Sequence, residues 1–388
     1  MKVLHAISGI ARANGGPAIA LAGLASAQVK AGLDTTIFST WVDLHSEEMA
    51  GELRGKGVKV QLLGPCHNPM SRHANLPALL QEQIRAADIV HIHALWESVQ
   101  YHAARLCRKL GKPYVITPHG MLDPWNMRTG WLKKRFYLAL RMNGHLAHAK
   151  AIHACSELER DWLQRLRLRP PVFVEPLGID PCEFQTLPLP GTFSNRHPQL
   201  RERPYVIFLG RIHKGKGWEY LIPAMRRVQP SAVMAVIAGP DSAGFRQRAE
   251  ALAHQCGVAD RILFTGPLYG VDRLAALRDA ELFVLPSCHE NFSVASLEAL
   301  ACGTPAIVSD QVGLGNEIAK ARVGQVVPLH TGDLAGVITD WLSRRGQRSA
   351  VSAAAREMAL SGFSWQCLAL RWIEHYGAIL TQSEGARV

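Results

Sequence analysis

Two glutamates, Glu290 and Glu298, have the type and spacing to bind a ligand rich in hydroxyl groups. Glu290 follows an apolar run expected to be a strand, and Glu298 lies about two helical turns into the next expected helix, on a similar face. Between them, residues 291–295 offer the unbonded N–H groups of a helix start. Carboxylates bind hydroxyls, and such amides bind anions. The pattern predicts a nucleotide-sugar site, although this spacing also occurs by chance in exposed helices.

A second candidate is the basic, glycine-rich turn 210–217, which reads Gly-Arg-Ile-His-Lys-Gly-Lys-Gly between an apolar run and an expected helix at Trp218. Its cations include Arg211 and Lys216. These suit a diphosphate, because each charge-assisted hydrogen bond contributes about 1.5–3 kcal/mol when partly desolvated. A solvated basic turn is the alternative.

A third candidate is the loop 8–17, which contains Gly15 and Gly16 and leads into an Ala/Leu-rich helix. Adjacent glycines let the backbone approach a phosphate or a sugar, and Pro17 suits a first helical turn. The spacing does not match Gly-x-Gly-x-x-Gly, which argues against a nicotinamide cofactor. A tight turn is the alternative.

A metal site is not expected. His91 and His93 share one face of an expected strand, but no third ligand is evident beside them, so a structural or site-lining role is favoured. The sequence contains no Asp-x-Asp motif, and its eight cysteines include no Cys-x-x-Cys pair. We interpret the cysteines as reduced thiols.

The elements that must position these residues form two similar halves. Short runs rich in Val and Ile alternate with longer amphipathic stretches, which is typical of strands buried on both faces of a parallel sheet. Strands are expected at 2–7, 35–40, 58–63, 89–93, 114–117, 151–154 and 172–175, and then at 205–210, 233–239, 262–266, 282–285, 306–309 and 325–327. The fold class is therefore α/β, with two doubly wound parallel sheets.

The predicted domains are 1–185 and 205–365, joined by a linker at 186–204, because 181–204 holds five prolines and no sustained periodicity. We expect a C-terminal helix at 366–388, which can return to the first domain and pack on it. Ligands of such sheets bind beyond the carboxyl ends of the strands, which is where the three candidate segments lie.

Composition excludes several classes of protein. The 388 residues are 48% hydrophobic and 19% charged, without low-complexity runs, so the chain is not disordered, collagenous or a coiled coil. The apolar stretch 18–27 is too short to cross a bilayer, and no signal peptide is evident at the start, so a cytoplasmic location is expected. The net charge of +11 favours anionic partners.

Taken together, these motifs resemble those of retaining glycosyltransferases of the GT-B family 4. Glu290 and Glu298 match its Glu-x7-Glu signature, and the glycine loop, Gly210-Arg211-x-x-x-x-Lys216-Gly217, the Cys-Gly-Thr-Pro turn and Gly313-x-x-x-Glu317 extend the match over nearly the whole chain. The resemblance implies the GT-B fold, in which two Rossmann-like domains face an interdomain cleft. It also implies transfer of a sugar from a nucleoside-diphosphate sugar in bacterial exopolysaccharide or envelope biosynthesis.

The resemblance assigns roles to individual residues. It implies that Glu298 binds ribose hydroxyls, that Glu290 contacts the donor sugar, and that Arg211 and Lys216 neutralise the diphosphate. The resemblance also implies that His119 contacts the donor sugar. The alternative is that His119 lies in a turn and only caps backbone groups. The remaining donor-binding predictions are Gly15, Gly16, Asn291, Phe292, Ser293 and Val294, where many relatives have glycine in place of Ser293.

The same resemblance implies chemistry without a metal or another cofactor, because the arginine and lysine replace a divalent ion. A retaining double displacement needs a carboxylate nucleophile. The family offers none agreed upon, so the acceptor is expected to attack on the face from which the phosphate leaves. The leaving phosphate oxygen would then act as the base.

The acceptor side is expected on the first domain. Asp123 and Arg128 are candidate acceptor contacts, and segment 125–142 mixes aromatic residues with five cations. A basic amphipathic helix suits anionic headgroups, so reversible contact with the inner membrane face is predicted, together with a glycan or polyprenyl-diphosphate-linked glycan acceptor. An ordinary packed helix with a solvated basic face is the alternative.

Three other functions compete with transfer. A nucleotide-sugar-binding protein without activity is disfavoured by the intact set of Glu290, Glu298, Arg211 and Lys216. A sugar-nucleotide epimerase would need an acid/base pair around the sugar, which is not evident. Nucleic-acid binding is suggested by charge alone, and no recognised motif supports it.

Overall fold

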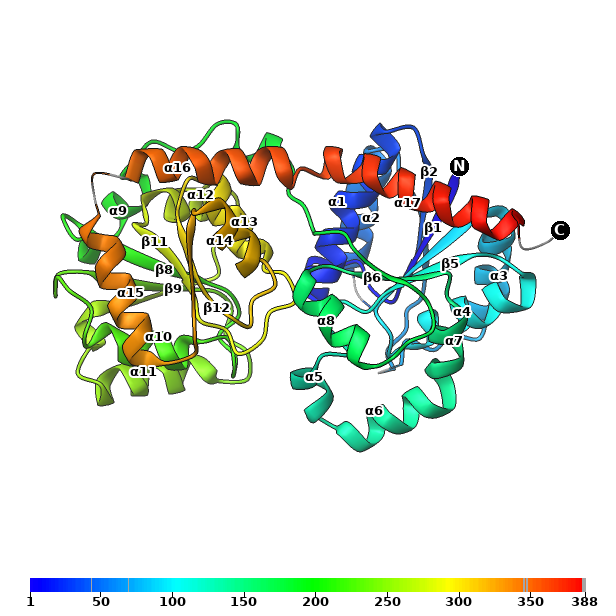
Figure 1. The fold of residues 1–388 in the computed structure, drawn as a ribbon, viewed down its shortest axis with the longest axis horizontal. Helices are drawn as coiled ribbons and strands as arrows, with labels where there is room; N and C mark the ends of the chain where they lie inside the picture. Colours follow the sequence, from blue (N-terminus) through cyan, green and yellow to red (C-terminus); the bar gives the residue numbers. More distant parts are fainter. Residues whose placement is uncertain (43, 69, 345, 347, 386–388) are drawn as a thin grey trace. The chain divides into compact units, whose positions relative to one another are not determined.

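The computed structural model describes residues 1–42, 44–68, 70–344, 346 and 348–385. The chain divides into two compact units, Met1–Gly178 with Trp365–Val388 and Ile179–Ser364. Each unit is a parallel sheet with helices packed on it (Figure 1). These are the two Rossmann-like sheets that the sequence predicts.

Unit 1 holds a seven-stranded sheet in the order β3-β2-β1-β4-β5-β6-β7. Its strands are β1 (Lys2–Ile7), β2 (Asp34–Thr40), β3 (Lys59–Leu63), β4 (Ile89–His93), β5 (Tyr114–Thr117), β6 (Ala151–Ala154) and β7 (Val172–Val174). Its helices are α1 (Gly16–Lys30), α2 (Leu44–Gly55), α3 (Leu76–Ala86), α4 (Ser98–Leu110), α5 (Pro124–Arg128), α6 (Trp131–Tyr137), α7 (Asn143–His148), α8 (Glu157–Arg165) and α17 (Trp365–Gly385), with a π-helical turn at Leu138–Met142.

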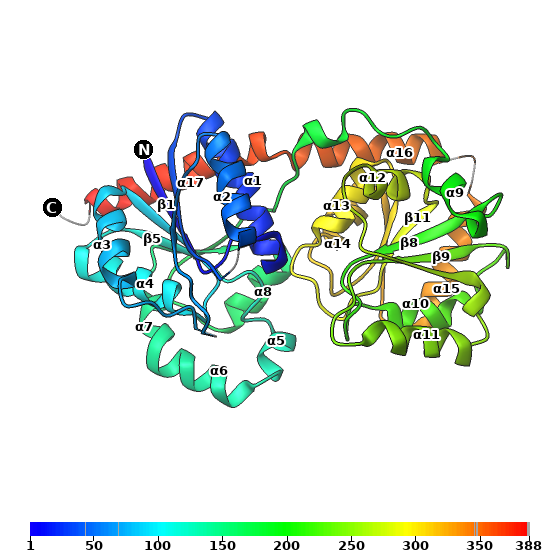
Figure 2. The same ribbon diagram turned by 180° about the vertical axis from the view of Figure 1, so that it is seen from behind.

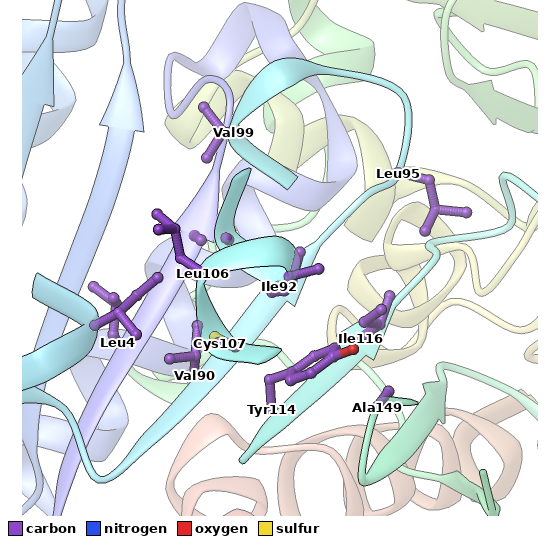
Figure 3. Close-up of a cluster of buried hydrophobic side chains, with 14 of the residues drawn as sticks. Leu4, Val90, Ile92, Leu95, Val99, Leu106, Cys107, Tyr114, Ile116 and Ala149 are labelled. Carbon is purple, nitrogen blue, oxygen red and sulfur yellow. The ribbon is translucent and has the colours of Figure 1, made fainter. Parts of the chain in front are cut away.

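Each face of this sheet is covered by a different set of helices. On one face, Val90 and Ile92 of β4 and Ile116 of β5 pack with Leu106 and other side chains of α4 (Figure 3). On the other face, α17 packs beside α1, and its Trp372 is buried in the same cluster as β-strand residues (Figures 1 and 2). The last helix thus belongs to unit 1, and residues 386–388 of the predicted helix lie outside the described residues.

Unit 2 holds a six-stranded sheet in the order β10-β9-β8-β11-β12-β13. Its strands are β8 (Tyr205–Leu209), β9 (Met234–Ala238), β10 (Ile262–Gly266), β11 (Leu282–Leu285), β12 (Ala306–Ser309) and β13 (Gly324–Val327). Its helices are α9 (Thr192–Arg196), α10 (Trp218–Met225), α11 (Phe245–Gln255), α12 (Gly270–Asp279), α13 (Val294–Ala301), α14 (Gly315–Ala321), α15 (Thr331–Ser343) and α16 (Arg348–Glu357), followed by a π-helical turn at Met358–Gly362.

The segment predicted as a linker is an ordered part of unit 2. Helix α9 lies within 186–204, and the carboxylate of Asp279 accepts hydrogen bonds from the backbone N–H groups of Gly191, Phe193 and Ser194 at 2.7, 2.9 and 3.0 Å. Phe193 is buried. The prolines that suggested a linker interrupt regular structure, but they do not prevent the segment from packing on α12.

Both sheets have a topological switch point, where the strand order reverses. It lies between β1 and β4 in unit 1 and between β8 and β11 in unit 2. Ligands of open parallel sheets bind at the carboxyl ends of the strands on either side of such a point. Loops 8–17, 210–217 and 286–293 follow β1, β8 and β11, so all three candidate segments start at switch points.

Candidate active site

The loops that follow β8 and β11 are bonded to each other at the switch point of unit 2. The carbonyl oxygen of Gly215 accepts hydrogen bonds from the Cys288 N–H at 2.8 Å and from the Ser287 hydroxyl at 3.0 Å. Gly217 has a φ of +97°, and a Cβ built there would lie 2.2 Å from the carbonyl oxygen of Pro286. Only glycine meets both conditions, so this residue fixes the approach of the two loops.

Two amides of the basic turn are already bonded within the protein. The carboxylate of Glu219, in the first turn of α10, accepts hydrogen bonds from the N–H groups of Gly215 at 2.9 Å and Gly217 at 3.2 Å. Sequence reasoning missed this role, although an acidic residue in a first helical turn is its usual signal. The turn therefore has its side chains, Arg211 and Lys216, to offer to an anion.

The structure brings Lys216 and Glu290 together. The Lys216 ammonium forms an ion pair with the Glu290 carboxylate, and both side chains are about one-quarter exposed, at 22% and 24%. Arg211 is exposed and makes no ion pair within the described residues. Backbone hydrogen bonds from Glu290 N–H to Gln311 and from Gly313 N–H to the Glu290 carbonyl, at 3.0 and 2.9 Å, hold the glutamate.

Ser293 begins α13 in a conformation that favours glycine. Its φ is +81° and its ψ is 77°, and its hydroxyl accepts a hydrogen bond from the Ser296 N–H at 3.2 Å. The two serine hydroxyls lie 2.6 Å apart, and Ser293 is buried. The hydrogen bond of this cap offsets the cost of the left-handed backbone, so that serine can occupy a conformation that favours glycine.

The neighbours of Ser293 are held to different degrees. Phe292 is buried, and its ring centroid lies 6.0 Å from that of Phe363. The N–H of Leu314 donates to the Phe292 carbonyl at 3.0 Å. Asn291 and Val294 are half-buried. The loop is thus a defined structure rather than a mobile tip.

Glu298 is held by an arginine that the sequence analysis did not single out. Arg273 of α12 donates to the Glu298 carboxylate at 2.8 Å and to the Glu183 carboxylate at 3.0 Å. The Glu298 side chain is 15% exposed. Burial raises the pKa of Glu298 to about 7, since loss of water outweighs the attraction of the Arg273 guanidinium. Glu298 therefore titrates near neutral pH.

In unit 1, Gly15 and Gly16 lie where the loop after β1 enters α1. Gly15 has a φ of +85°, and a Cβ built on either glycine would meet nothing within 4 Å. Helix α1 begins at Gly16, and Pro17 stands in its first turn. The backbone here is open to approach, as the prediction of a donor-binding loop requires.

His119 follows β5 with a φ of +53°, between two buried groups. Its Nε2 lies 3.1 Å from Nδ1 of His93, and its Nδ1 lies 3.7 Å from Sγ of Cys155. Burial lowers the pKa of His119 to about 4, so the ring is neutral at pH 7. Glu159 accepts from the N–H groups of Gly120 and Cys155 at 2.6 and 2.7 Å and fixes the turn.

The two predicted acceptor contacts differ in their surroundings. Asp123 is buried and caps α5, accepting hydrogen bonds from the Asn126 N–H at 2.7 Å and from the Asn126 side-chain amide at 2.6 Å. Its carboxylate is thus used in local structure. Arg128, in the last turn of α5, is exposed and can meet a ligand.

The expectation that His91 and His93 lack a third partner is wrong. Ring nitrogens of His5, His91 and His93 all lie within 4.8 Å of one another, because β1 and β4 are neighbours and His5 pairs with His91 in register. All three rings are buried. Four of their six nitrogens form hydrogen bonds with groups outside the cluster, and the other two, His5 Nδ1 and His93 Nε2, bond to each other. In this structure the three histidines belong to a hydrogen-bond network.

Comparison with known families agrees with this architecture. Residues 15–178 match the model of a glycosyl transferase 4-like domain, and residues 192–358 match the model of glycosyl transferases group 1. The chain belongs to the group 1 glycosyl transferases. The first match falls in unit 1 and the second in unit 2.

Individual relatives of this group 1 glycosyl transferase resemble it over different lengths. A D-inositol 3-phosphate glycosyltransferase from Mycobacteroides abscessus is 36% identical over 176 residues, which cover 44% of this chain and 39% of the relative. An alpha-maltose-1-phosphate synthase from Mycolicibacterium smegmatis is 28% identical over 75% of this chain and 79% of its own length. The chain thus spans well under half of the first relative.

Among solved structures, the protein HepE from Anabaena, in complex with UDP and glucose, superposes with a TM-score of 0.77. The match covers 97% of this chain and 100% of that chain at 19% identity. At this identity the likeness establishes the fold. The group 1 glycosyl transferase thus has the GT-B fold that its sequence predicts.

Within unit 2, the structure joins Lys216 to Glu290 and places Ser293 at the helix start between the two glutamates. Within unit 1, it brings His119 to His93 and Cys155. Gly15 and Gly16 lie where the loop after β1 enters α1, Asp123 caps α5, and Arg128 is the last residue of α5. No helix in the described part of the chain has the length and apolar character needed to span a bilayer.

Proposed function

We propose that this chain is a retaining glycosyltransferase that moves a sugar from a nucleoside diphosphate to a glycan or lipid-linked glycan acceptor in polysaccharide or envelope biosynthesis. The observation that carries the proposal is the ion pair between Lys216 and Glu290 at the unit 2 switch point. One group is suited to a phosphate and the other to sugar hydroxyls, and they stand side by side where such folds bind ligands.

The two groups exchange partners when the donor binds. The diphosphate attracts the Lys216 ammonium away from Glu290, and the exposed Arg211 adds a second positive charge. Glu290 is then free to accept hydrogen bonds from hydroxyls of the donor sugar. Two fixed cations can stabilise the leaving diphosphate without a divalent ion, so no metal or other cofactor enters this proposal.

The transfer itself needs no protein nucleophile. The acceptor hydroxyl oxygen bonds to the anomeric carbon on the face that the phosphate leaves, the carbon–phosphate oxygen bond breaks, and the leaving oxygen takes the hydroxyl proton. The configuration is retained. The protein contributes position, charge neutralisation and a helix start at α13 that points its N–H groups towards an anion.

Nucleotide binding tests the donor site first. A thermal-shift panel of UDP, GDP and ADP should identify one base, since a ligand at 100 times its dissociation constant stabilises by about 2.7 kcal/mol. UDP is the first candidate because HepE, which shares the fold, is described with UDP. The result should be the same with and without EDTA. No shift with any nucleotide would contradict the proposal.

Variants of the basic turn sharpen this test. Lys216→Ala and Arg211→Ala should each weaken transfer by about 3 kcal/mol, roughly 100-fold or more in kcat/KM. Lys214→Ala is the matched control, because Lys214 is exposed in the same turn and has no assigned role. Equal losses in Lys214→Ala and Lys216→Ala would show that net charge matters rather than the site. Analysis of the product anomer tests retention.

We also propose that the acceptor side of unit 1 contacts an anionic bilayer. Large apolar side chains on α6 and the turn after it are exposed, namely Trp131 at 49%, Leu132 at 58%, Phe136 at 68% and Leu140 at 75%. Lys133, Arg135 and Arg141 stand among them. Apolar groups beside cations suit an interface with anionic headgroups. This exposed α6 surface favours membrane contact over an ordinary packed helix.

Vesicle co-sedimentation tests this contact. The chain should bind vesicles of phosphatidylglycerol and phosphatidylcholine, and not vesicles of phosphatidylcholine alone. Phe136→Ser with Leu140→Ser should reduce binding, because both side chains are exposed and contribute apolar area. Leu189→Ser is the matched control, since Leu189 is 79% exposed in unit 2. Equal binding by all three proteins would refute the role of α6.

A further inference from the structure

A chain of polar groups crosses the interior of unit 1 in two hydrogen-bonded segments and ends at His119. It joins residues from α1, β1, β4, β5, β6 and α17 with the residue that follows β7, and these residues are far apart in the sequence. The first segment joins the Glu175 carbonyl, His153, Thr117, His91 and Tyr376, and the second joins Gln28, His5, His93 and His119. All except His119 are buried.

The inner end of the chain fixes the direction of its hydrogen bonds. A backbone carbonyl can only accept, so His153 Nε2, 2.6 Å from the Glu175 carbonyl oxygen, must carry the proton. Neutral imidazole has one donor and one acceptor, so His153 Nδ1 accepts from the Thr117 hydroxyl at 2.8 Å. Thr117 in turn accepts from His91 Nε2 at 2.6 Å. His91 Nδ1 then accepts from the Tyr376 hydroxyl at 2.7 Å.

Gln28 begins the second half of the chain. The Tyr376 hydroxyl proton is used on His91, and Gln28 lowers the pKa of Tyr376 against the stronger effect of burial. The buried amide nitrogen of Gln28 has no hydrogen-bond partner among the described residues. The amide oxygen of Gln28 faces His5, and its distance to His5 Nε2 is 2.8 Å.

The second half of the chain then has one consistent arrangement. His5 Nε2 donates to Gln28, so His5 Nδ1 accepts from His93 Nε2 at 3.0 Å. His93 Nδ1 accepts from His119 Nε2 at 3.1 Å. The remaining nitrogen, His119 Nδ1, is left as an acceptor, and the Cys155 thiol, a weak donor, lies 3.7 Å from it.

We propose that the buried segment from Gln28 to His93 positions the proton of His119 on Nε2, so that the half-buried His119 presents Nδ1 as an acceptor for a hydroxyl group. The proposal rests on the proposed function in one respect, since it takes a donor-sugar hydroxyl as the group that displaces the thiol. His93, His5 and Gln28 are positioning residues. They act through His119 and touch no substrate.

The energetics of the interior support a neutral, ordered chain. Burial lowers the pKa of His5 to about 4, that of His153 to about 3, and those of His91 and His93 well below their usual range. Charging one ring would also break the alternation of donor and acceptor. Trp372 of α17 packs over His91 and His153, with ring centroids 4.7 Å apart in both pairs, and limits their rotation.

Long-range ¹H–¹⁵N spectra of the imidazole rings of the full chain test the proposal at pH 7 without any ligand. His119 should show the pattern of a neutral ring with its proton on Nε2. His93→Phe removes the acceptor and should return His119 to a mixture of tautomers, whereas His93→Asn retains an acceptor near the Nδ1 position and should preserve the single tautomer. His67→Phe, at an exposed histidine, should change nothing.

Three results would overturn the proposal. They are a proton on Nδ1 of His119 in the wild-type chain, a charged His119 ring at pH 7, or loss of the His5, His91 and His93 proton patterns on addition of stoichiometric Zn²⁺, which would show a metal site. The wild-type spectrum alone tests the position of the His119 proton, even if the His93 variants do not fold.

A kinetic arm separates this inference from the proposed function. His93→Phe should lower kcat/KM for the nucleotide sugar about tenfold, which is the usual worth of one hydrogen bond. It should leave the affinity for the nucleoside diphosphate unchanged, because that ligand lacks the sugar. His93→Asn should recover the loss. If the wild type binds no nucleotide, the proposed function fails while the tautomer measurement still decides the role of the chain.

Discussion

Acidification from pH 7 to pH 5 should destabilise unit 1 through its buried histidines. His5 has its pKa lowered to about 4 and His153 to about 3, in both cases chiefly by burial. The unfolded chain binds a proton at each with a pKa near 6.5. Because the unfolded state binds more protons, the stability that these groups contribute is complete above pH 6.5 and is lost as pH falls towards their folded pKa values.

The size of the effect follows from those values. Between pH 7 and pH 5 each of the two rings should cost about 2 kcal/mol of unfolding free energy, so the pair should cost about 4 kcal/mol. His91 and His93, whose pKa values are also lowered, change stability in the same direction. The loss expected from His5 and His153 together exceeds the contribution of an exposed ion pair such as Lys59 with Asp34, which is about 0–1 kcal/mol.

Urea unfolding followed by tryptophan fluorescence measures this loss. A Trp218→Phe, Trp341→Phe background keeps tryptophans in unit 1 alone, because these two are the tryptophans of 179–364. His153→Gln should reduce the loss by about 2 kcal/mol, and His67→Gln, at an exposed site, should not. A unit 1 transition that loses less than about 1 kcal/mol between the two pH values would refute the reasoning.

Three stability predictions concern unit 2. Asp279→Ala should lower its unfolding free energy by about 2–3 kcal/mol, because three backbone donors lose a charged acceptor, and amide exchange in 191–194 should rise in parallel. Ser293→Ala should lower the unfolding free energy by about 1–2 kcal/mol, because it removes the cap and keeps the left-handed backbone. Ser293→Gly should be close to neutral, because glycine adopts this backbone without strain. Equal effects of the two variants would disprove the idea that the cap offsets the cost of the left-handed backbone. Gly217→Ala should lower both melting temperature and nucleotide affinity, since its Cβ would meet the Pro286 carbonyl at 2.2 Å; an unchanged affinity would show that the approach of the two loops is unimportant.

Sequence reasoning found the sheets because buried parallel strands leave a local signal. The strands at Ile89–His93, Tyr114–Thr117 and Ala306–Ser309 have the predicted bounds, since each is a short run of residues buried on both faces. The motifs in the loops that follow β8 and β11 could also be recognised from the local sequence, because each lies within one turn or one helix start.

The parts that were missed depend on pairing between distant residues. Arg273 reaches Glu298 from the preceding helix, and His5 reaches His93 only after β1 and β4 become neighbours. Asp279 orders a proline-rich segment from more than 80 positions away. Such contacts are consequences of strand order and packing, which no local pattern encodes.

The two signature glutamates are held in different ways, and this difference predicts how binding depends on pH. Glu290 is paired with Lys216, and both side chains are about one-quarter exposed, whereas the Glu298 side chain is 15% exposed beside Arg273 with a pKa raised to about 7. If Glu298 accepts hydrogen bonds from ribose hydroxyls as a carboxylate, its ionised fraction should set the affinity for nucleotide. That fraction increases about tenfold between pH 6 and pH 8.

Calorimetric titration over this range measures the dependence with uridine, which lacks phosphates that titrate near pH 6. The dissociation constant of the wild type should fall as pH rises, by up to tenfold. Glu298→Gln should remove the dependence, because the amide keeps the size of the side chain and does not titrate. Glu290→Gln is the matched control and should leave the slope unchanged. A wild-type affinity that is flat from pH 6 to pH 8 would mean that Glu298 does not accept the ribose hydroxyls as an anion, and its assignment to the ribose would then have to be abandoned.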